Sequence, residues 1–277
     1  MGEALKVDLR KIIGSKNPKL LKRLPGFFLN WIERFIHQEE INYILSEGKD
    51  EKGPDFINTI FRINNVTLKS QFIERIPETG GCIIAANHPL GGVDGLALMA
   101  EVSKRRKDFL FLANDILLNI SPLKDSFLPV NKVGSTNRDS LAQISAAYAS
   151  GKVIIVFPSG LVSRKIDGVV QDLAWQKSVV QKANQHQLPI IPTFIDGQNS
   201  KRFYRISKLR KIFGIKANLE MFTLPDEMFK QKKGKISFVI GKPLMNHDLP
   251  SELDDYATAN WIKNHVYSLK ENHEKPH

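Results

Sequence analysis

The chain has 277 residues, enough for one large α/β domain or for a core domain with a smaller helical piece. Hydrophobic residues make up 42% of the chain and three residues are Trp, a composition that excludes an intrinsically disordered protein. The 40 Lys and Arg residues outnumber the 29 Asp and Glu residues. The resulting net charge of +11 indicates an anionic partner: nucleic acid, a membrane surface, or an acidic protein or substrate.

The single cysteine, Cys82, excludes an internal disulfide and is consistent with a reducing compartment. Without further thiols or closely spaced His pairs, the sequence predicts no zinc site. Charged residues interrupt any early apolar run that a signal peptide would need, and no stretch approaches the roughly 18 uncharged apolar residues of a membrane span. If lipid is the partner, we therefore expect a peripheral protein at the cytoplasmic face of the membrane.

The first predicted element is an amphipathic helical unit. Residues 1–26 carry seven basic residues: Lys6, Arg10, Lys11, Lys16, Lys19, Lys22 and Arg23. Residues 27–36 are apolar at helical spacing, so we expect a helical unit over about residues 17–47. Such a unit can lie on a membrane or pack on the core, and one helix can do both. We assign residues 1–55 to this membrane-associating unit and residues 56–277 to an α/β domain.

From residue 56 onward, short apolar runs alternate with helical patterns. The runs that predict strands are 61–68, 82–86, 109–113, 128–130, 153–157, 190–194 and 236–240. The patterns that predict helices are 94–107, 140–150, 174–185 and 254–274. Continuous apolar strands separated by helices are typical of an α/β fold. We expect a mostly parallel mixed sheet flanked by helices on both faces.

The loop of residues 87–95 has the composition of an active site. It follows a buried strand and precedes a helix, a position where α/β folds carry functional residues. Asp94 can fold back across Gly91 and Gly92 to fix the tautomer of His88 and to stabilise its imidazolium, which predicts a general base. The alternative is that Asp94 only caps the following helix and that His88 is a turn residue.

A second loop, residues 157–165, also follows a buried strand. Its Pro-Ser-Gly turn precedes a basic pair, and the guanidinium of Arg164 is suited to a phosphate or a carboxylate. The alternative is an ordinary turn with a solvated pair of Arg164 and Lys165. A nucleophilic Ser159 is disfavoured, because the sequence around it lacks the Gly-x-Ser-x-Gly elbow of serine hydrolases.

Residues 201–213 hold six basic residues and no acid, with aromatic residues between them. This composition favours an anionic membrane interface, and an acidic carrier protein could use the same surface. A merely solvated helix and RNA binding are the competing interpretations, and no nucleic-acid motif accompanies the patch. The histidines other than His88 lack a matching carboxylate context, so we interpret them as surface residues.

Together these segments resemble the glycerolipid acyltransferase superfamily, which is typified by lysophosphatidic acid acyltransferases. Asn87, His88 and Asp94 resemble its first sequence block, an Asn-His pair followed by Asp. Residues 127–132, 157–164 and 188–193 resemble its second, third and fourth blocks, in the same order along the chain. The resemblance covers roughly residues 60–245.

Departures from the family pattern bear on the acceptor. Five residues separate His88 from Asp94 where the family usually has four, Ser159 stands in place of Glu, and Lys132 occupies the Arg position of the second block. Glu and Arg at those positions are associated with a glycerol-phosphate acceptor. The two loops are most similar to the haemolysin-related branch, which includes bacterial enzymes that O-acylate lyso-ornithine or lyso-glycine lipids.

The resemblance implies an O-acyltransferase of membrane lipid biosynthesis. His88 would take the proton from an acceptor hydroxyl while Asp94 orients the ring, and the hydroxyl oxygen would attack the thioester of acyl-CoA or acyl-acyl-carrier protein. Backbone N–H groups would stabilise the oxyanion, and neither a metal nor another cofactor is required. The residues expected to bind acceptor or substrate are Asn87, Gly91, Gly92, Lys132, Ser159, Gly160, Ser163 and Arg164.

Two other functions stay open at this point. An enzyme that acylates 1-acylglycerol-3-phosphate to phosphatidic acid would differ only in its acceptor. A non-catalytic membrane- or lipid-binding protein with a degenerate site is favoured by the missing Glu and by the longer spacing between His88 and Asp94.

Overall fold

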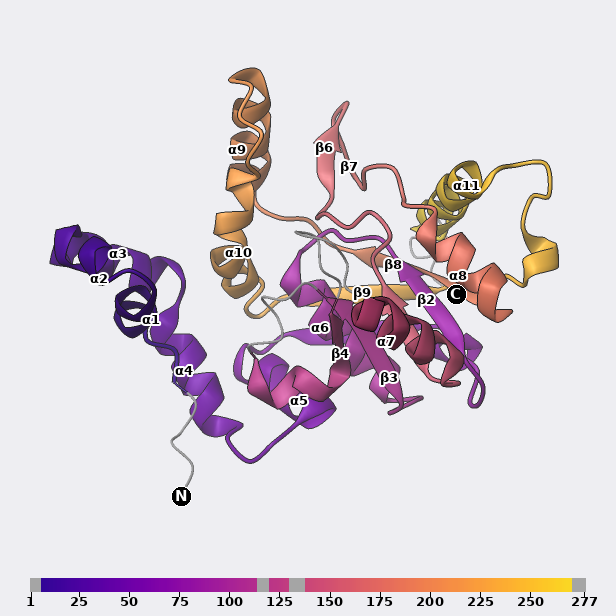
Figure 1. Ribbon diagram of the computed structural model, residues 1–277, viewed down its shortest axis with the longest axis horizontal. Coiled ribbons are helices and arrows are strands. Elements are labelled where there is room, and N and C mark those ends of the chain that lie inside the picture. Colours follow the sequence, from indigo (N-terminus) through magenta and orange to yellow (C-terminus); the bar gives the residue numbers. More distant parts are fainter. Residues whose placement is uncertain (1–5, 114–119, 130–137, 271–277) are drawn as a thin grey trace.

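The computed structural model describes residues 6–113, 120–129 and 138–270. In this part of the chain a seven-stranded sheet has the order β1-β9-β8-β2-β5-β3-β4 (Figure 1). The strands are β1 (Thr67–Gln71), β2 (Cys82–Ala86), β3 (Phe109–Ala113), β4 (Phe127–Pro129), β5 (Val153–Val156), β8 (Ile190–Asp196) and β9 (Lys235–Ile240). Neighbouring strands are parallel except β8 and β9, so the predicted mostly parallel mixed sheet is confirmed.

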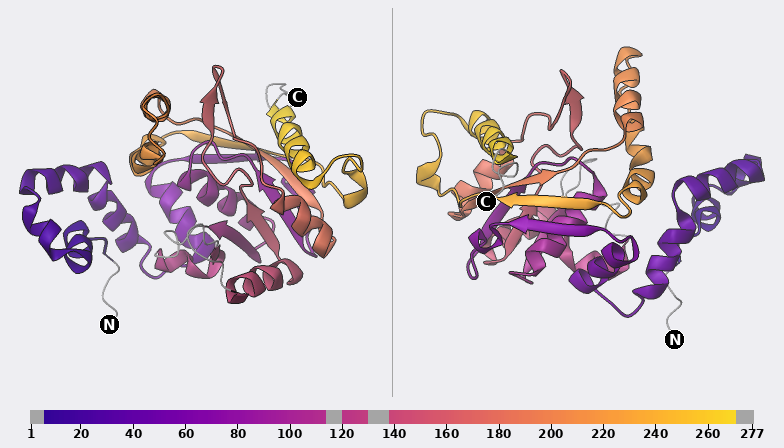
Figure 2. Two further views of the ribbon diagram at one scale, coloured as in Figure 1. Left: turned by 45° about the horizontal axis from the view of Figure 1, so that its top comes forward. Right: turned by 180° about the vertical axis from the view of Figure 1, so that it is seen from behind.

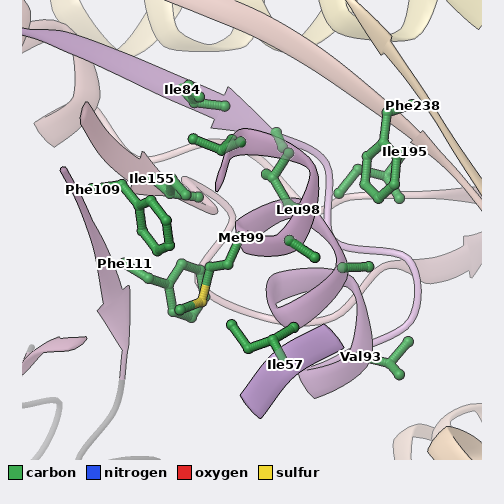
Figure 3. Packing of buried hydrophobic residues seen from close by; sticks show 14 of the residues in the cluster. Ile57, Ile84, Val93, Leu98, Met99, Phe109, Phe111, Ile155, Ile195 and Phe238 are labelled. Carbon is green, nitrogen blue, oxygen red and sulfur yellow. The ribbon is translucent and has the colours of Figure 1, made fainter. Parts of the chain in front are cut away.

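Helices cover both faces of the sheet. The helices α5 (Gly53–Ile63) and α6 (Gly92–Ser103) pack on one face, where Ile57, Ile84 and Leu98 belong to one buried cluster (Figure 3). The helices α7 (Arg138–Ala149), α8 (Ser178–His186) and α11 (Asp255–Ser268) supply the cluster on the other face, which includes Ile83. Ile83 and Ile84 serve opposite clusters because successive strand residues point to opposite faces. This explains why the central strands read as unbroken apolar runs.

The predicted strand over residues 61–68 is wrong at its start. Phe61 lies in α5, and β1 begins only at Thr67. The apolar residues Phe56, Ile57, Ile60 and Phe61 recur at helical spacing and are all buried. A short apolar run cannot distinguish a buried strand from the last turn of a buried helix.

A small antiparallel hairpin was not predicted. Its strands are β6 (Arg164–Ile166) and β7 (Val169–Gln171). They are joined by Asp167 and Gly168, which both have positive φ angles, 48° and 87°. An Asp-Gly pair of this kind is a known hairpin signal, but the flanking strands of three residues are too short to show an alternating pattern.

Four short helices replace the single N-terminal unit that the pattern over residues 17–47 suggests. They are α1 (Leu9–Lys16), α2 (Pro18–Arg23), α3 (Gly26–Phe35) and α4 (Gln38–Glu47). Pro18 and Pro25 explain two of the breaks, since proline ends one helix and begins the next. Buried Ile44 and Leu45 of α4 join the core cluster of α5 and α6, whereas α1–α3 extend away from the sheet (Figure 1). The division at residue 55 stays a prediction.

A second projection lies between β8 and β9, and we call residues 197–234 the arm. It contains α9 (Lys201–Ile212), the short helix η4 (Leu219–Thr223) and α10 (Leu224–Lys230), and α9 rises well above the sheet (Figures 1 and 2). Further short helices are η1 (Ile73–Arg75), η3 (Ser121–Ser126) and η5 (Asn246–Asp248).

The arm and the N-terminal helices meet at His37, and the interpretation of this residue as a plain surface histidine is wrong. Its Nδ1 lies 2.9 Å from Glu40 Oε1 and its Nε2 lies 3.1 Å from Asp226 Oδ1 on α10. The ring stacks on Phe229 at a centroid distance of 4.4 Å. Arg202 of α9 completes the junction, because it pairs with Asp226 and lies 5.4 Å from the ring centroid of Phe35.

Candidate active site

The loop between β2 and α6, residues 87–91, places His88 at the carboxyl end of a central strand. In open α/β sheets this edge is where ligands bind. Gly91 has a φ angle of 86°, and a Cβ atom there would lie 2.9 Å from Leu224 Cδ2 of the arm. Only glycine adopts this conformation without strain and allows so close an approach. The turn therefore brings the chain back so that α6 begins at Gly92 and Asp94 lies in its first turn.

His88 and Asp94 form the predicted pair. The distance from His88 Nδ1 to Asp94 Oδ1 is 3.0 Å, and Asp94 is fully buried. The second oxygen of Asp94 accepts a hydrogen bond of 2.8 Å from the backbone N–H of Leu90. A buried carboxylate facing Nδ1 places the ring proton there, so the lone pair that can accept a proton is on Nε2.

The His88 ring is held by packing as well as by hydrogen bonding. It stacks on Phe157 with a centroid distance of 4.1 Å and an interplanar angle of 14°. The side chain of His88 keeps 17% of its surface exposed, so the ring is fixed but remains reachable. Phe157 begins the second loop, residues 157–163, and so this loop shapes the base from its other side.

Asp172 joins the two loops, and the sequence analysis did not identify it. Its Oδ1 accepts hydrogen bonds from the backbone N–H of His88 at 3.1 Å and from Ser163 Oγ at 2.5 Å. Its Oδ2 accepts from Trp175 Nε1 at 2.9 Å. Burial raises the pKa of the Asp172 carboxyl, and these donors act against that shift. A direct backbone bond of 2.7 Å from Ser163 N to His88 O completes the link.

Asn87 has partners within the protein. Its Nδ2 donates to Ile195 O at 2.9 Å, and its Oδ1 accepts from Ile195 N at 2.6 Å. These bonds continue the pairing of β2 with β8 by one residue and fix the start of the loop. Asn199 then donates from Nδ2 to Pro89 O at 3.1 Å, which attaches the arm to the same loop.

The predicted substrate residues of the second loop are mostly buried. Ser159 is 7% exposed and its hydroxyl donates to Leu161 O at 2.7 Å, a local turn bond that gives no support to a nucleophilic serine. Gly160 has a φ angle of 63° in that turn. Ser163 is fully buried and bonded to Asp172. Gly92 is exposed at the start of α6, and Lys132 lies outside the described residues.

Arg164 has protein partners in place of the acceptor contact that the sequence predicts. Only 2% of it is exposed, and its Nη2 donates to Glu220 Oε1 at 2.7 Å while Nη1 bonds to Val162 O. Glu220 Oε2 accepts from Arg210 Nε at 2.6 Å. Although burial acts in the opposite direction, the bond from Arg210 and the charge of Arg164 hold the pKa of Glu220 below its usual value. The three side chains thus form a charged cluster between the second loop and the arm.

A His–Asp pair with a buried carboxylate thus lies on a strand-to-helix turn of an α/β fold, and comparison with known proteins assigns the family of the chain. The sequence model of the acyltransferase family matches residues 11–275, so the chain belongs to the acyltransferases. Two curated relatives are both named lyso-glycine lipid O-acyltransferase. The one from Phocaeicola vulgatus is 34% identical over 264 residues and the one from Bacteroides thetaiotaomicron is 35% identical over 265 residues. The aligned regions cover 95% of this chain in each case, and 95% and 97% of the respective relatives.

The fold also has a solved counterpart. A crystal structure of the 1-acyl-sn-glycerophosphate (LPA) acyltransferase from Thermotoga maritima superposes with a TM-score of 0.50 and 16% sequence identity, covering 90% of each chain. The superfamily and the α/β fold expected from the sequence are confirmed. No helix within the described residues combines the length and apolar character that a membrane crossing requires.

Proposed function

We infer that this acyltransferase transfers a fatty acyl chain to a hydroxyl of a lyso-aminolipid, with a lyso-glycine lipid as the acceptor class. The observation that carries the chemistry is the 3.0 Å contact between His88 Nδ1 and buried Asp94. The observation that carries the acceptor is the likeness to two relatives of that name over 95% of the chain.

In the proposed reaction the acceptor hydroxyl gives its proton to His88 Nε2 as its oxygen attacks the carbonyl carbon of an acyl thioester. Asp94 stabilises the imidazolium that forms. Collapse of the tetrahedral intermediate breaks the C–S bond, and His88 returns the proton to the leaving thiolate. The products are an ester and a free thiol, so no bond to the enzyme forms at any step.

The oxyanion of that intermediate lies next to the start of α6. The first N–H groups of a helix have no acceptor within the helix, and the dipole there favours negative charge. Gly92 is exposed at this end, so a substrate oxygen can reach its backbone. The same dipole favours the carboxylate of Asp94.

The charges around the second loop support an acceptor without a phosphate. Binding of a phosphate normally uses a free basic fork. Arg164 is committed to Glu220, and Ser159 cannot position a basic residue by charge as the family's Glu would. The single negative charge of the glycine carboxylate in a lyso-glycine lipid needs fewer free basic groups than a phosphate dianion does.

We place the reaction at the surface of an anionic membrane, with acyl-CoA or acyl-acyl-carrier protein as the donor. Phe27 is 76% exposed and Trp31 is 55% exposed on α3, and exposed Lys22 and Arg23 precede them on α2. Apolar and basic side chains in this arrangement match a lipid interface. Both donors are cytoplasmic, so the cytoplasmic face is the proposed location.

The decisive test compares acceptors with one labelled acyl donor. We expect kcat/KM for lyso-glycine lipid to exceed that for lysophosphatidic acid at least about tenfold, because an unpaired phosphate forgoes a charge-assisted bond of about 1.5–3 kcal/mol. His88→Ala should lower kcat about 100-fold or more with either acceptor. A preference for lysophosphatidic acid would overturn the acceptor, and activity of His88→Ala within threefold of the parent would overturn the base.

A further inference from the structure

The direction of two strands places the arm on the edge of the sheet that carries His88. β2 and β8 are parallel, so both end at this edge. β9 is antiparallel to β8, so the connection between them must begin and end at the same edge. Residues 197–234 therefore rise beside the active site (Figure 2).

The base of the arm is fixed to both active-site loops. Phe203 and Tyr204 of α9 form a small buried cluster with Val162 of the second loop. Glu220 of the arm also forms ion pairs with Arg164, which directly follows the second loop, and with Arg210 of α9. A charged cluster this deeply buried resists separation, because removing one partner leaves a buried charge unpaired. Apolar packing and buried ion pairs therefore both attach the arm to the second loop.

The tip of the arm has the opposite character. Its exposed large hydrophobic residues are Leu209 (46%), Ile212 (66%), Phe213 (73%), Ile215 (40%) and Leu219 (38%), and Phe222 (73%) is exposed on η4 below them. Exposed Lys208, Lys211 and Lys216 lie among them, whereas exposed Lys201, Arg202 and Arg205 lie nearer the base of α9. The sequence has no acid between Lys201 and Leu219.

We propose that the tip of the arm inserts into an anionic lipid bilayer, and that this contact sets the height of His88 above the lipid. The proposal rests on the proposed action at a membrane. Exposed aromatic and aliphatic side chains gain free energy by leaving water, and the basic residues behind them match anionic headgroups. An acidic carrier protein could pair with the basic residues, but it would not explain why Phe213 and Phe222 are exposed.

Because of the junction at His37, the arm and α3 would provide two neighbouring points of contact with the membrane. Arg202 of α9 lies against Phe35 of α3 and pairs with Asp226, which also contacts His37. The base of the arm and the end of α3 are thus in direct contact. In Figure 1 the arm rises above the domain and α1–α3 extend to its left, so both project away from the sheet.

A single attached probe can test the insertion, because the chain has one cysteine. Cys82 is buried and burial raises the pKa of its thiol to about 12, so the native thiol does not react with a probe. We would attach an NBD fluorophore to Phe213→Cys. The matched control is Tyr256→Cys on α11, where Tyr256 is 50% exposed and outside the proposed contact.

With vesicles containing phosphatidylglycerol, we expect a blue shift of NBD at position 213 and quenching by doxyl groups on the acyl chains, with neither at position 256. The double variant Ile212→Ser, Phe213→Ser should partition onto these vesicles at least about tenfold more weakly. Its untagged control Tyr256→Ser should bind like the parent. Absence of quenching at position 213 in vesicle-bound protein overturns the proposal. So does unchanged vesicle binding of the double variant with slower transfer from acyl-acyl-carrier protein, which would make the tip a carrier-protein site.

The acceptor and the arm contact can fail separately. Quenching at position 213 in a protein that does not acylate lyso-glycine lipid would leave the arm contact intact and remove the proposed acceptor. Acylation of lyso-glycine lipid in vesicles without quenching at position 213 would support the proposed acceptor and remove the arm contact. NBD at position 213 should be quenched equally with and without the His88→Ala substitution, because this substitution removes the proposed base but leaves the surface of the arm unchanged.

Discussion

Asp172 connects the loop that carries His88 with the loop that carries Ser163. It has only acceptor oxygens, and the backbone N–H of His88, Ser163 Oγ and Trp175 Nε1 all donate to them. Through His88 N it fixes the start of the turn whose end is fixed by Asp94. It is therefore a positioning residue for the base.

Asp172→Asn should destabilise the protein by about 2–4 kcal/mol, because the amide nitrogen would face a donor and leave it unpaired in a buried place. Chemical denaturation followed by circular dichroism measures this change. Asp125→Asn, at an exposed position, is the matched control and should change stability by less than about 0.5 kcal/mol. Equal stability of Asp172→Asn and the parent would mean that the loops are joined by backbone bonds alone.

The partner of a side chain could be predicted from the sequence when both residues lie in one segment, and could not be predicted when they lie in segments far apart. His88 and Asp94 share one turn, so their pairing follows from chain geometry alone. Arg164 was expected to face an acceptor because its partner Glu220 lies 56 residues away, and the hairpin, the helices α8 and α9 and the strand β8 between them give no sign of the pairing. Asp172 was missed for the same reason, since its role depends on a β6–β7 turn that returns it to Ser163.

At the scale of elements, α4 and α10 meet through a titratable contact. Burial alone would raise the pKa of Asp226, but hydrogen bonds from Lys230 and His37, with the charge of Arg202 nearby, lower its pKa to about 2. A carboxyl with a lowered pKa in the folded state adds stability above its unfolded pKa of about 3.9. This increment is lost as the pH falls from about 4 toward 2.

Asp226→Asn should therefore lower Tm at pH 5 by roughly 3 °C, and the difference from the parent should shrink as the pH approaches 3. Thermal unfolding at half-unit pH steps measures both effects. A difference that stays constant down to pH 3 would show that the carboxylate charge contributes nothing to the junction.

The apolar strands of the sheet were predicted well from the sequence, and the hairpin β6–β7 and the short helices of the arm were not. The core strands of β2, β5, β8 and β9 and the helix α11 appear within a few residues of their expected bounds. The helices of the arm were noticed as a basic and aromatic stretch, yet the turn to α10 was not. The apolar residues Leu209 and Ile212 of α9 are exposed, and periodicity shows only which side of a helix is apolar, not whether another element covers that side.

At the scale of the whole molecule, the net charge of +11 and the exposed apolar tips act together. Electrostatic attraction to anionic vesicles is screened within about 10 Å at 0.1 M salt and about 3 Å at 1 M salt. Burial of apolar side chains is not weakened in this way. Sedimentation with vesicles should accordingly fall between 0.1 and 1 M NaCl but should not vanish.

Phosphatidylcholine vesicles are the control for that measurement, because without anionic headgroups the salt dependence should nearly disappear. Complete release from anionic vesicles at 1 M NaCl would assign the whole contact to charge. Vesicle binding that does not change with the NaCl concentration would assign the whole contact to insertion of apolar side chains.

The reversed pair of strands at one side of the sheet has a consequence for how this enzyme can diverge. β1 is parallel to β9, so the chain enters β1 at the same edge as it enters β9, and the two entry turns are joined by bonds from Lys233 N to Asn64 O and from Thr67 N to Gly234 O. The arm and the turn that leads from α5 into β1 therefore meet at the edge of the sheet that carries His88. Lengthening the turn into β9 would change the tilt of the arm while the His88–Asp94 pair, which follows the oppositely running strand β2, keeps its geometry. Relatives could then change which lipids they reach without any change at the atoms that perform the transfer.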